Sequence, residues 1–151
     1  MAKSTTVRFS KFIVRLGDGA TPVEVFAAPC GFNSKSFNRS KSFGETTVPN
    51  CPDDDAPAWT ERDVQSMSAT ISGEGVLAKQ AVARWEEAFA SEVSTNCEVE
   101  LIYPDGDSEL YTGAFHLESF EISGTRGERV TANITLQSDG PVDYARTELT
   151  P

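Results

Sequence analysis

Apolar and polar residues alternate most clearly in the last third of the chain, where the pattern predicts a long β-hairpin over Glu109–Val142. One face of the first strand carries Tyr111, Gly113, Phe115 and Leu117, and one face of the second carries Val130, Ala132, Ile134 and Leu136. The apolar parity shifts at Ser119–Phe120, which predicts a β-bulge or a passage from one sheet to another. The clearest order in the chain therefore lies in a hairpin that carries no catalytic motif.

The remaining strands are shorter and are bounded by turn residues. We expect them at 7–16, 23–28, 32–43, 64–75 and 97–103, with turns at 17–19 and 104–107. The segment 32–43 is predicted as an edge strand, because Lys35, Arg39 and Lys41 would discourage pairing with another strand. Its mixture of bases and phenylalanines is also typical of a single-strand nucleic-acid platform, which the overall charge disfavours.

One amphipathic helix is predicted, over Val76–Ser91. Its apolar stripe is formed by Leu77, Ala81, Trp85 and Phe89, with Ala78, Val82 and Ala88 beside it. The stripe is narrow and rich in alanine, which favours close packing on a sheet, and Trp85 is interpreted as a core residue and not a ligand-stacking one.

Two segments are predicted to lack regular structure. Residues 1–6 form an expected flexible N-terminal arm, and residues 44–60 form an expected long loop that contains three prolines and the run Asp53-Asp54-Asp55. Loops of this length in a compact domain are usually functional or ordered by a partner, so we expect one of these roles here. A calcium site on the three aspartates is disfavoured, because they lack the alternate spacing of an EF-hand loop.

The pattern as a whole predicts a mainly β protein of one domain spanning residues 1–151. Its element order, β-β-(β)-loop-β-α-β-β-β, indicates an antiparallel β-sandwich or barrel with one flanking helix at about 76–91. No apolar run approaches the length of a membrane span, and no signal peptide is recognised in the basic N-terminus.

The net charge of the chain limits the classes of function that we expect. The formal net charge is −10, which argues against a DNA- or RNA-binding surface that needs clustered bases. An acidic wall would instead let DNA pass without adhering, although acidic charge can also serve solubility alone.

Catalytic and metal-binding motifs are absent from the sequence. Cys30, Cys51 and Cys97 are spaced too widely for a zinc ribbon or a CxxC motif, and His116 is the single histidine. We therefore expect neither enzyme activity nor a cofactor, and His116 is interpreted as a solvent-facing or interface residue. The default for the cysteines is three reduced thiols, with a disulfide as the alternative.

Several motifs together resemble the major tail tube proteins of tailed bacteriophages. They are SMSATISGEGV at 66–76 followed by the helix, the Tyr103-Pro104-Asp105-Gly106 turn, the hairpin with Gly113-Ala114-Phe115 and Ser119-Phe120-Glu121, and the ITLQSDGPV segment at 134–142. The resemblance covers roughly Val7–Val142, and it departs from the family pattern between Asn33 and Thr60.

The resemblance implies a virion protein that is made in the host cytoplasm. Its subunits would form hexameric rings that stack into a hollow tube for DNA ejection, and double-stranded DNA would pass without specific binding. Partners would be other tail proteins: the terminator, the tape measure, the baseplate and, in a contractile tail, a sheath. No membrane partner is implied.

Within this picture three sets of residues are candidates for function. The lumen acids are expected among Glu98, Glu100, Glu118, Glu121 and Glu128. An inter-subunit disulfide would involve Cys51, Cys30 or Cys97. The stacking loop would use Pro49, Asp53, Asp54, Asp55 and Trp59.

The alternative function is a β-sandwich on a virion or cell surface that binds a carbohydrate or a receptor. It requires a cluster of exposed aromatic residues, for which Trp59 and the set Phe32, Phe37 and Phe43 are the candidates.

Overall fold

A computed structural model describes residues 4–17, 26–27, 31–49, 51–52 and 55–148. A short 3-10 turn, η1 (Phe9–Lys11), precedes the first strand. The other elements are β1 (Phe12–Gly17), β2 (Phe26–Ala27), β3 (Phe32–Val48), β4 (Trp59–Val76), α1 (Lys79–Ala90), β5 (Thr95–Ile102), β6 (Ser108–Ser123) and β7 (Thr131–Thr147). The strands form one seven-stranded sheet in the order β2-β1-β5-β6-β7-β4-β3, and every neighbouring pair is antiparallel.

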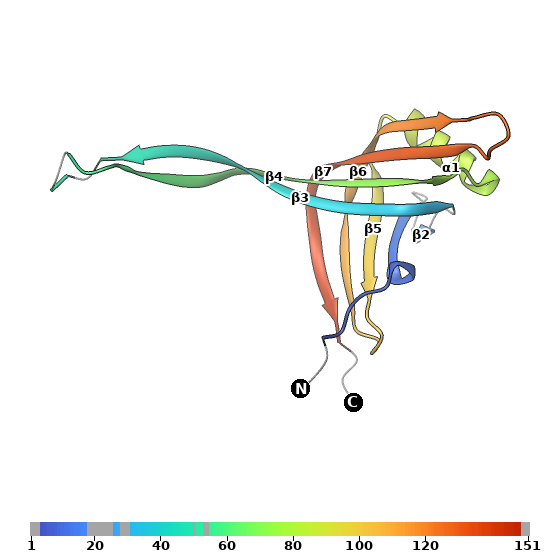
Figure 1. Cartoon of the computed structure of the whole chain (residues 1–151), viewed down its shortest axis with the longest axis horizontal. Helices are drawn as coiled ribbons and strands as arrows, with labels where there is room; N and C mark the ends of the chain where they lie inside the picture. The colour runs from blue at the N-terminus through green and yellow to red at the C-terminus, as the bar shows by residue number, and fades with distance from the viewer. Residues whose placement is uncertain (1–3, 18–25, 28–30, 50, 53–54, 149–151) are drawn as a thin grey trace.

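This single sheet folds over on itself through the β6–β7 hairpin (Figure 1). The start of β6 pairs with β5 and with the end of β7, whereas the end of β6 pairs with the start of β7, which in turn pairs with β4. We call the β2-β1-β5 side the descending half and the β3-β4 side the arm half. In Figure 1 β5 runs downward, the antiparallel β1 lies beside it, and β3 and β4 cross above them.

Two register shifts in the hairpin produce the bend. One lies between Gly113 and Phe115, opposite the stretch from Ser138 to Val142, and the other lies between Leu117 and Ser119. Gly140 has a φ of +100°, which a residue with a side chain rarely adopts, and Pro141 follows it at a position outside the regular ladder. The shift at Leu117/Ser119 confirms the parity change predicted one residue later.

The core lies between the two halves. Leu16 and Val99 come from the descending half, Ile71 and Leu136 from the arm half, and all four are almost fully buried. Trp85 of α1 completes the core, with its ring edge-on to Phe32 at a centroid distance of 5.5 Å. Burial of Trp85 confirms its interpretation as a core residue.

The predicted fold class is confirmed: the protein is mainly β, antiparallel, with one helix and the expected element order. The helix begins later than predicted, at Lys79, because Val76 still pairs with Thr131 in β4 and the Leu77 amide donates to Val130 O. Phe89, predicted in the apolar stripe, is 54% exposed, since Ala88 continues the stripe from Ala81 and Trp85.

The prediction of a loop over 44–60 was wrong at both ends. Strands β3 and β4 stay paired out to Val48 and Trp59, so the connection spans only residues 49–58. β-Branched residues at 46–48 and an ion pair of 3.1 Å between Arg62 and Glu45 favour the ladder there, and the prolines are confined to the connection. The result is a hairpin arm, residues 43–64, that projects from the body (Figure 1).

The other boundaries differ less. The first strand begins at Phe12 and not at Val7, because η1 occupies residues 9–11. The edge position of β3 is confirmed, as it ends the sheet order. Of the strand expected at 23–28 only Phe26–Ala27 is described, and the turn at 17–19 falls largely outside the described residues, as do the first three residues of the expected N-terminal arm.

Candidate channel wall and assembly arm

The outward face of the arm half is almost entirely polar. Its side chains lie in cross-strand rows: Ser34, Glu74, Asn133 and Glu121; Ser36, Ser72, Thr135 and Ser119; Asn38, Thr70, Gln137 and His116; and Ser40 with Ser68. We call these rows the polar wall. None of these residues is lysine or arginine, because Lys35, Arg39 and Lys41 alternate to the opposite face of β3.

Neighbouring side chains of the polar wall hydrogen-bond to one another. Ser36 bonds to Ser72, and Ser40 to Ser68 at 3.1 Å. The Thr70 hydroxyl donates to Gln137 Oε1 at 2.9 Å, and Gln137 Nε2 donates to Glu118 Oε2 at 2.7 Å. Because these groups are already paired and none is cationic, the wall offers little to hold a phosphate backbone.

The five predicted lumen acids do not come together. Glu121 is part of the polar wall, and Glu118 is bonded to it through Gln137. Glu98 and Glu100 lie on β5 in the descending half, beside Arg15, whose Nη1 is 3.7 and 2.8 Å from their carboxylates. Glu128 lies in the exposed turn between β6 and β7.

One wall acid, Glu74, was missed by sequence reasoning. It lies in the same row as Glu121, with Asn133 between them. The signal for it was present, because Glu74 continues the polar parity of Ser68, Thr70 and Ser72 past Gly73.

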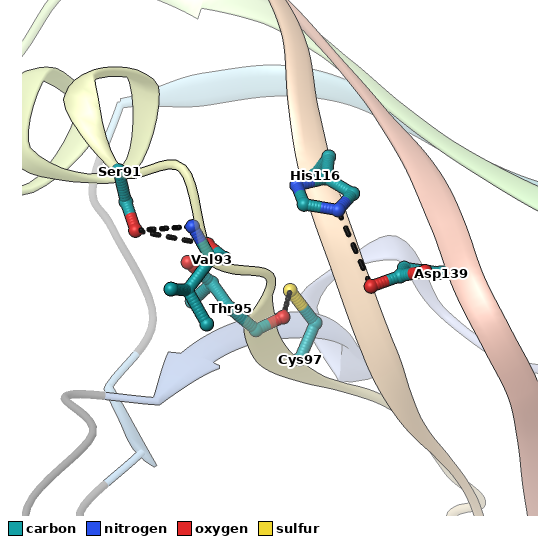
Figure 2. A network of polar contacts seen from close by, with 6 residues as sticks. All are labelled: Ser91, Val93, Thr95, Cys97, His116 and Asp139. Atoms are coloured by element: carbon teal, nitrogen blue, oxygen red, sulfur yellow. Dashed lines mark hydrogen bonds and ion pairs between the residues drawn. The ribbon is translucent and has the colours of Figure 1, made fainter.

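His116 and Asp139 form an exposed pair at the bend of the hairpin (Figure 2). His116 Nε2 is 3.2 Å from Asp139 Oδ2, and both side chains are about half exposed. The solvent-facing interpretation of His116 is therefore confirmed. In the same region Ser91 bonds to the backbone of Val93, which closes the turn between α1 and β5 (Figure 2). No group of three potential metal ligands occurs within the described residues.

The hairpin arm carries the predicted stacking residues that the structure describes. Pro49, Asp55 and Trp59 are exposed, with Trp59 at 82% of its surface, whereas Asp53 and Asp54 lie outside the described residues. Cys51 is exposed in the same connection. Cys97 is completely buried beside the Thr95 carbonyl, so its thiol is not accessible to another subunit. Cys30 lies outside the described residues.

The four aromatic candidates for a carbohydrate- or receptor-binding module do not come together on one exposed surface. Phe32 packs against Trp85 in the core, and the ring centroids of Phe37 and Tyr111 are 5.1 Å apart. Phe43 is half exposed but pairs across from Val64, whereas Trp59 pairs with Val48, five residues further out on the arm. The described residues thus give this alternative no specific support.

A second polar cluster closes the far end of the descending half. Tyr103 donates to Glu109 Oε2 at 2.5 Å, and Tyr144 donates to Glu109 Oε1 at 2.7 Å. The hydrogen bond from Tyr103, followed by that from Tyr144, lowers the pKa of Glu109, and acceptance by Glu109 raises the pKa of both tyrosines. The cluster joins the turn after β5 to both strands of the hairpin.

These surfaces define a structural subunit with open sheet edges and a polar face. The family model for phage tail tube proteins matches residues 6–144, and the chain belongs to this family. It is a structural component of a virion tail and not an enzyme. No curated protein matches the chain significantly. No helix among the described residues is long and apolar enough to cross a bilayer.

Solved structures share the fold at low identity. The chain is similar to a subunit in the tail of an empty gene transfer agent particle with C6 symmetry, at TM-score 0.73 and 17% identity over 93% of this chain and 99% of that one. It is also similar to the SPP1 tail tube, with a TM-score of 0.57 and 12% identity over 97% of this chain and 81% of that one. A chain in the sheath–tube complex of an extracellular contractile injection system matches with a TM-score of 0.59 and 14% identity over 94% of this chain and 93% of that one.

The Glu109 cluster predicts a pH-dependent stability. Because the folded-state pKa of Glu109 is lowered, its carboxylate stabilises the fold above the unfolded-state pKa, and this contribution is lost as the pH falls through the folded-state pKa. Glu109→Gln should therefore unfold at a lower temperature than the parent protein at pH 7, and the difference should shrink below about pH 4. Thermal unfolding followed by circular dichroism across this range measures it. The matched variant Tyr103→Phe/Tyr144→Phe should lose the same pH dependence, and an unchanged pH profile in Glu109→Gln would contradict the assignment.

Proposed function

We propose that the protein forms hexameric rings that stack into the hollow tube of a phage tail, and that this tube is an acidic conduit through which DNA leaves the capsid. The observation that carries the proposal is the polar wall, a four-strand face without lysine or arginine in a chain of the tail tube family. The C6 symmetry of the similar gene transfer agent tail supports six subunits per ring.

Open strand edges favour assembly through the sheet. β3 ends the sheet, and β4 loses its β7 partner beyond Thr70, so the arm presents unpaired backbone on both sides. Such edges pair readily with another chain, and closure into a ring would remove the liability. In such a ring the arm half would contribute to a continuous barrel with the polar wall turned to the channel.

The channel surface would then be hydroxyl-rich and acidic. Glu74, Glu118 and Glu121 would supply its negative charge, while the serine and threonine rows would stay neutral. Negative charge repels phosphate, and paired hydroxyls hold it weakly, so double-stranded DNA would pass without specific binding.

The end of the hairpin arm is the proposed contact between subunits of stacked rings. Trp59 is a large apolar side chain exposed on a two-stranded ribbon, and residues of this kind commonly anchor interfaces. Pro49 and Asp55 flank it in the connection, together with Asp53 and Asp54 in the sequence.

Other tail proteins are the remaining proposed partners. A terminator, a tape measure protein, a baseplate and, in a contractile tail, a sheath would meet the ends, lumen or outside of such a tube. The fold is shared with chains from an anti-feeding prophage baseplate and from a sheath–tube complex, which supports contacts of this class.

Electron microscopy of the purified protein tests the assembly. We expect rings or tubes of uniform bore in negative stain, with sixfold symmetry in averaged end views. Monodisperse small particles at every protein and salt concentration would overturn the proposed function.

Charge reversal on the wall tests the conduit. Glu118→Lys/Glu121→Lys should leave tubes intact but slow DNA ejection from virions, because lysines on the wall would hold phosphate. The matched control is Glu86→Lys/Glu92→Lys, which makes the same charge change on exposed residues of α1 and of the turn after it. Ejection at the parent rate in the wall variant would contradict an acidic channel.

A cysteine cross-link between subunits is also proposed, through Cys51 on the exposed connection of the arm. Tubes exposed to oxidising surroundings after lysis would give dimer bands on non-reducing gels, which Cys51→Ser would abolish. Monomer bands under both reducing and non-reducing conditions would rule the cross-link out. Cys30 is the remaining candidate partner, since Cys97 is buried.

A further inference from the structure

A large wedge opens where the sheet divides. β4 and β7 are paired only through Thr70–Val76 and Thr131–Gln137, and the last contact is the Ala69 amide donating to Ser138 Oγ at 2.9 Å. Beyond it β4 continues into the hairpin arm while β7 turns down with β6 (Figure 1). The space between them has a volume of about 1150 Å³. This exceeds the usual size of a small-ligand pocket and suits a segment of polypeptide.

The wedge combines apolar walls with two cations. Phe37, Phe43, Met67 and Tyr111 line it, with Met67 largely exposed, and Arg39 and Lys41 project from β3 between them. The Arg39 guanidinium lies 4.6 Å from the centre of the Tyr111 ring, which fixes its position. Among the described residues, no acid lines the wedge and neither cation has an ion-pair partner.

One face of the hairpin arm has the complementary chemistry. Trp59, Glu61 and Asp63 alternate on the same face of β4, and all three are exposed. Glu61 and Asp63 are two residues apart along their strand, as are Arg39 and Lys41, so the two pairs of charges share a spacing of roughly 7 Å. Trp59 matches the aromatic lining of the wedge.

The arm itself points to a second copy as the occupant. It is a two-stranded ribbon in which nearly every described residue is exposed, and such a ribbon is marginally stable in water unless something covers it. Residues 45–63 contain six acids, Glu45, Asp53, Asp54, Asp55, Glu61 and Asp63, against the single base Arg62. The acidic arm and the basic wedge of one chain are complementary, so the arm of one copy can pair with the wedge of the next copy, head to tail.

We propose that the Trp59–Glu61–Asp63 face of one subunit's arm docks in the wedge of a neighbouring subunit, with Glu61 and Asp63 against Arg39 and Lys41. This rests on the proposed function, because it specifies a contact within the same assembly. In this contact the wedge is the binding site of the arm. The contact is directional, so each subunit inserts its own arm into one neighbour and accepts the arm of another.

A charge swap tests the contact. Arg39→Glu/Lys41→Glu and Glu61→Lys/Asp63→Lys should each shift the purified protein from sedimenting tubes to the soluble fraction, because like charges would face each other in every contact. The quadruple variant carries both changes, restores opposite charges at each contact and should return tubes to the pellet. Arg126→Glu/Arg129→Glu, in the exposed β6–β7 turn, is the matched control and should assemble as the parent does.

The outcomes separate this contact from tube formation itself. Circular dichroism and thermal unfolding identify variants that fail to fold, and recovery in the quadruple variant excludes that explanation. Normal tubes from both double variants would overturn the wedge contact and leave the tube function standing. A quadruple variant that folds but stays soluble would also overturn it, since another occupant would then fill the wedge. A parent protein that never assembles would overturn both proposals.

Discussion

Backbone hydrogen bonding in the β6–β7 hairpin is the constraint on which the rest of the structure depends. The two strands serve both halves of the sheet, so they must change direction without leaving buried amides unpaired. The change of direction is confined to two register shifts and to Gly140-Pro141, which lie outside the regular ladder of hydrogen bonds. The backbone groups on either side of these points therefore stay paired. The position of the bend then decides where β4 loses its neighbour, where the wedge opens and which residues share the polar wall.

The sequence predicted most of what strand periodicity can encode. Alternation gave the hairpin, β4 and the edge position of β3, and the parity change gave the bulge near Ser119. Periodicity failed in the arm, where three prolines suggested a loop, because a cross-strand ladder depends on partners that no local window contains. It also could not sort the acids: Glu98 and Glu121 both alternate with apolar residues, and only the long-range pairing shows that they lie on different halves.

Charge in this protein is segregated and not merely abundant. Arg39 and Lys41 of β3 alternate inward to the wedge, Arg15 pairs with Glu98 and Glu100, and the polar wall carries neither lysine nor arginine. A net charge of −10 is therefore compatible with strongly basic local sites. The same β3 strand supplies serines to one surface and cations to the other, so the period of two along a strand separates a non-adhesive face from an adhesive one.

The order of strands in the sheet also bears on how the chain folds. Three of the strand pairs are hairpins between consecutive strands: β3–β4, β5–β6 and β6–β7. In contrast, β1 pairs with β5, which is distant in sequence; the hydrogen bond between Arg15 and Glu100 joins residues 85 positions apart. Contacts between distant residues carry a larger loop-closure cost and form later. The arm can thus be complete before the body is closed by β1, and a subunit still lacking its first strand would already expose the part that reaches for a neighbour.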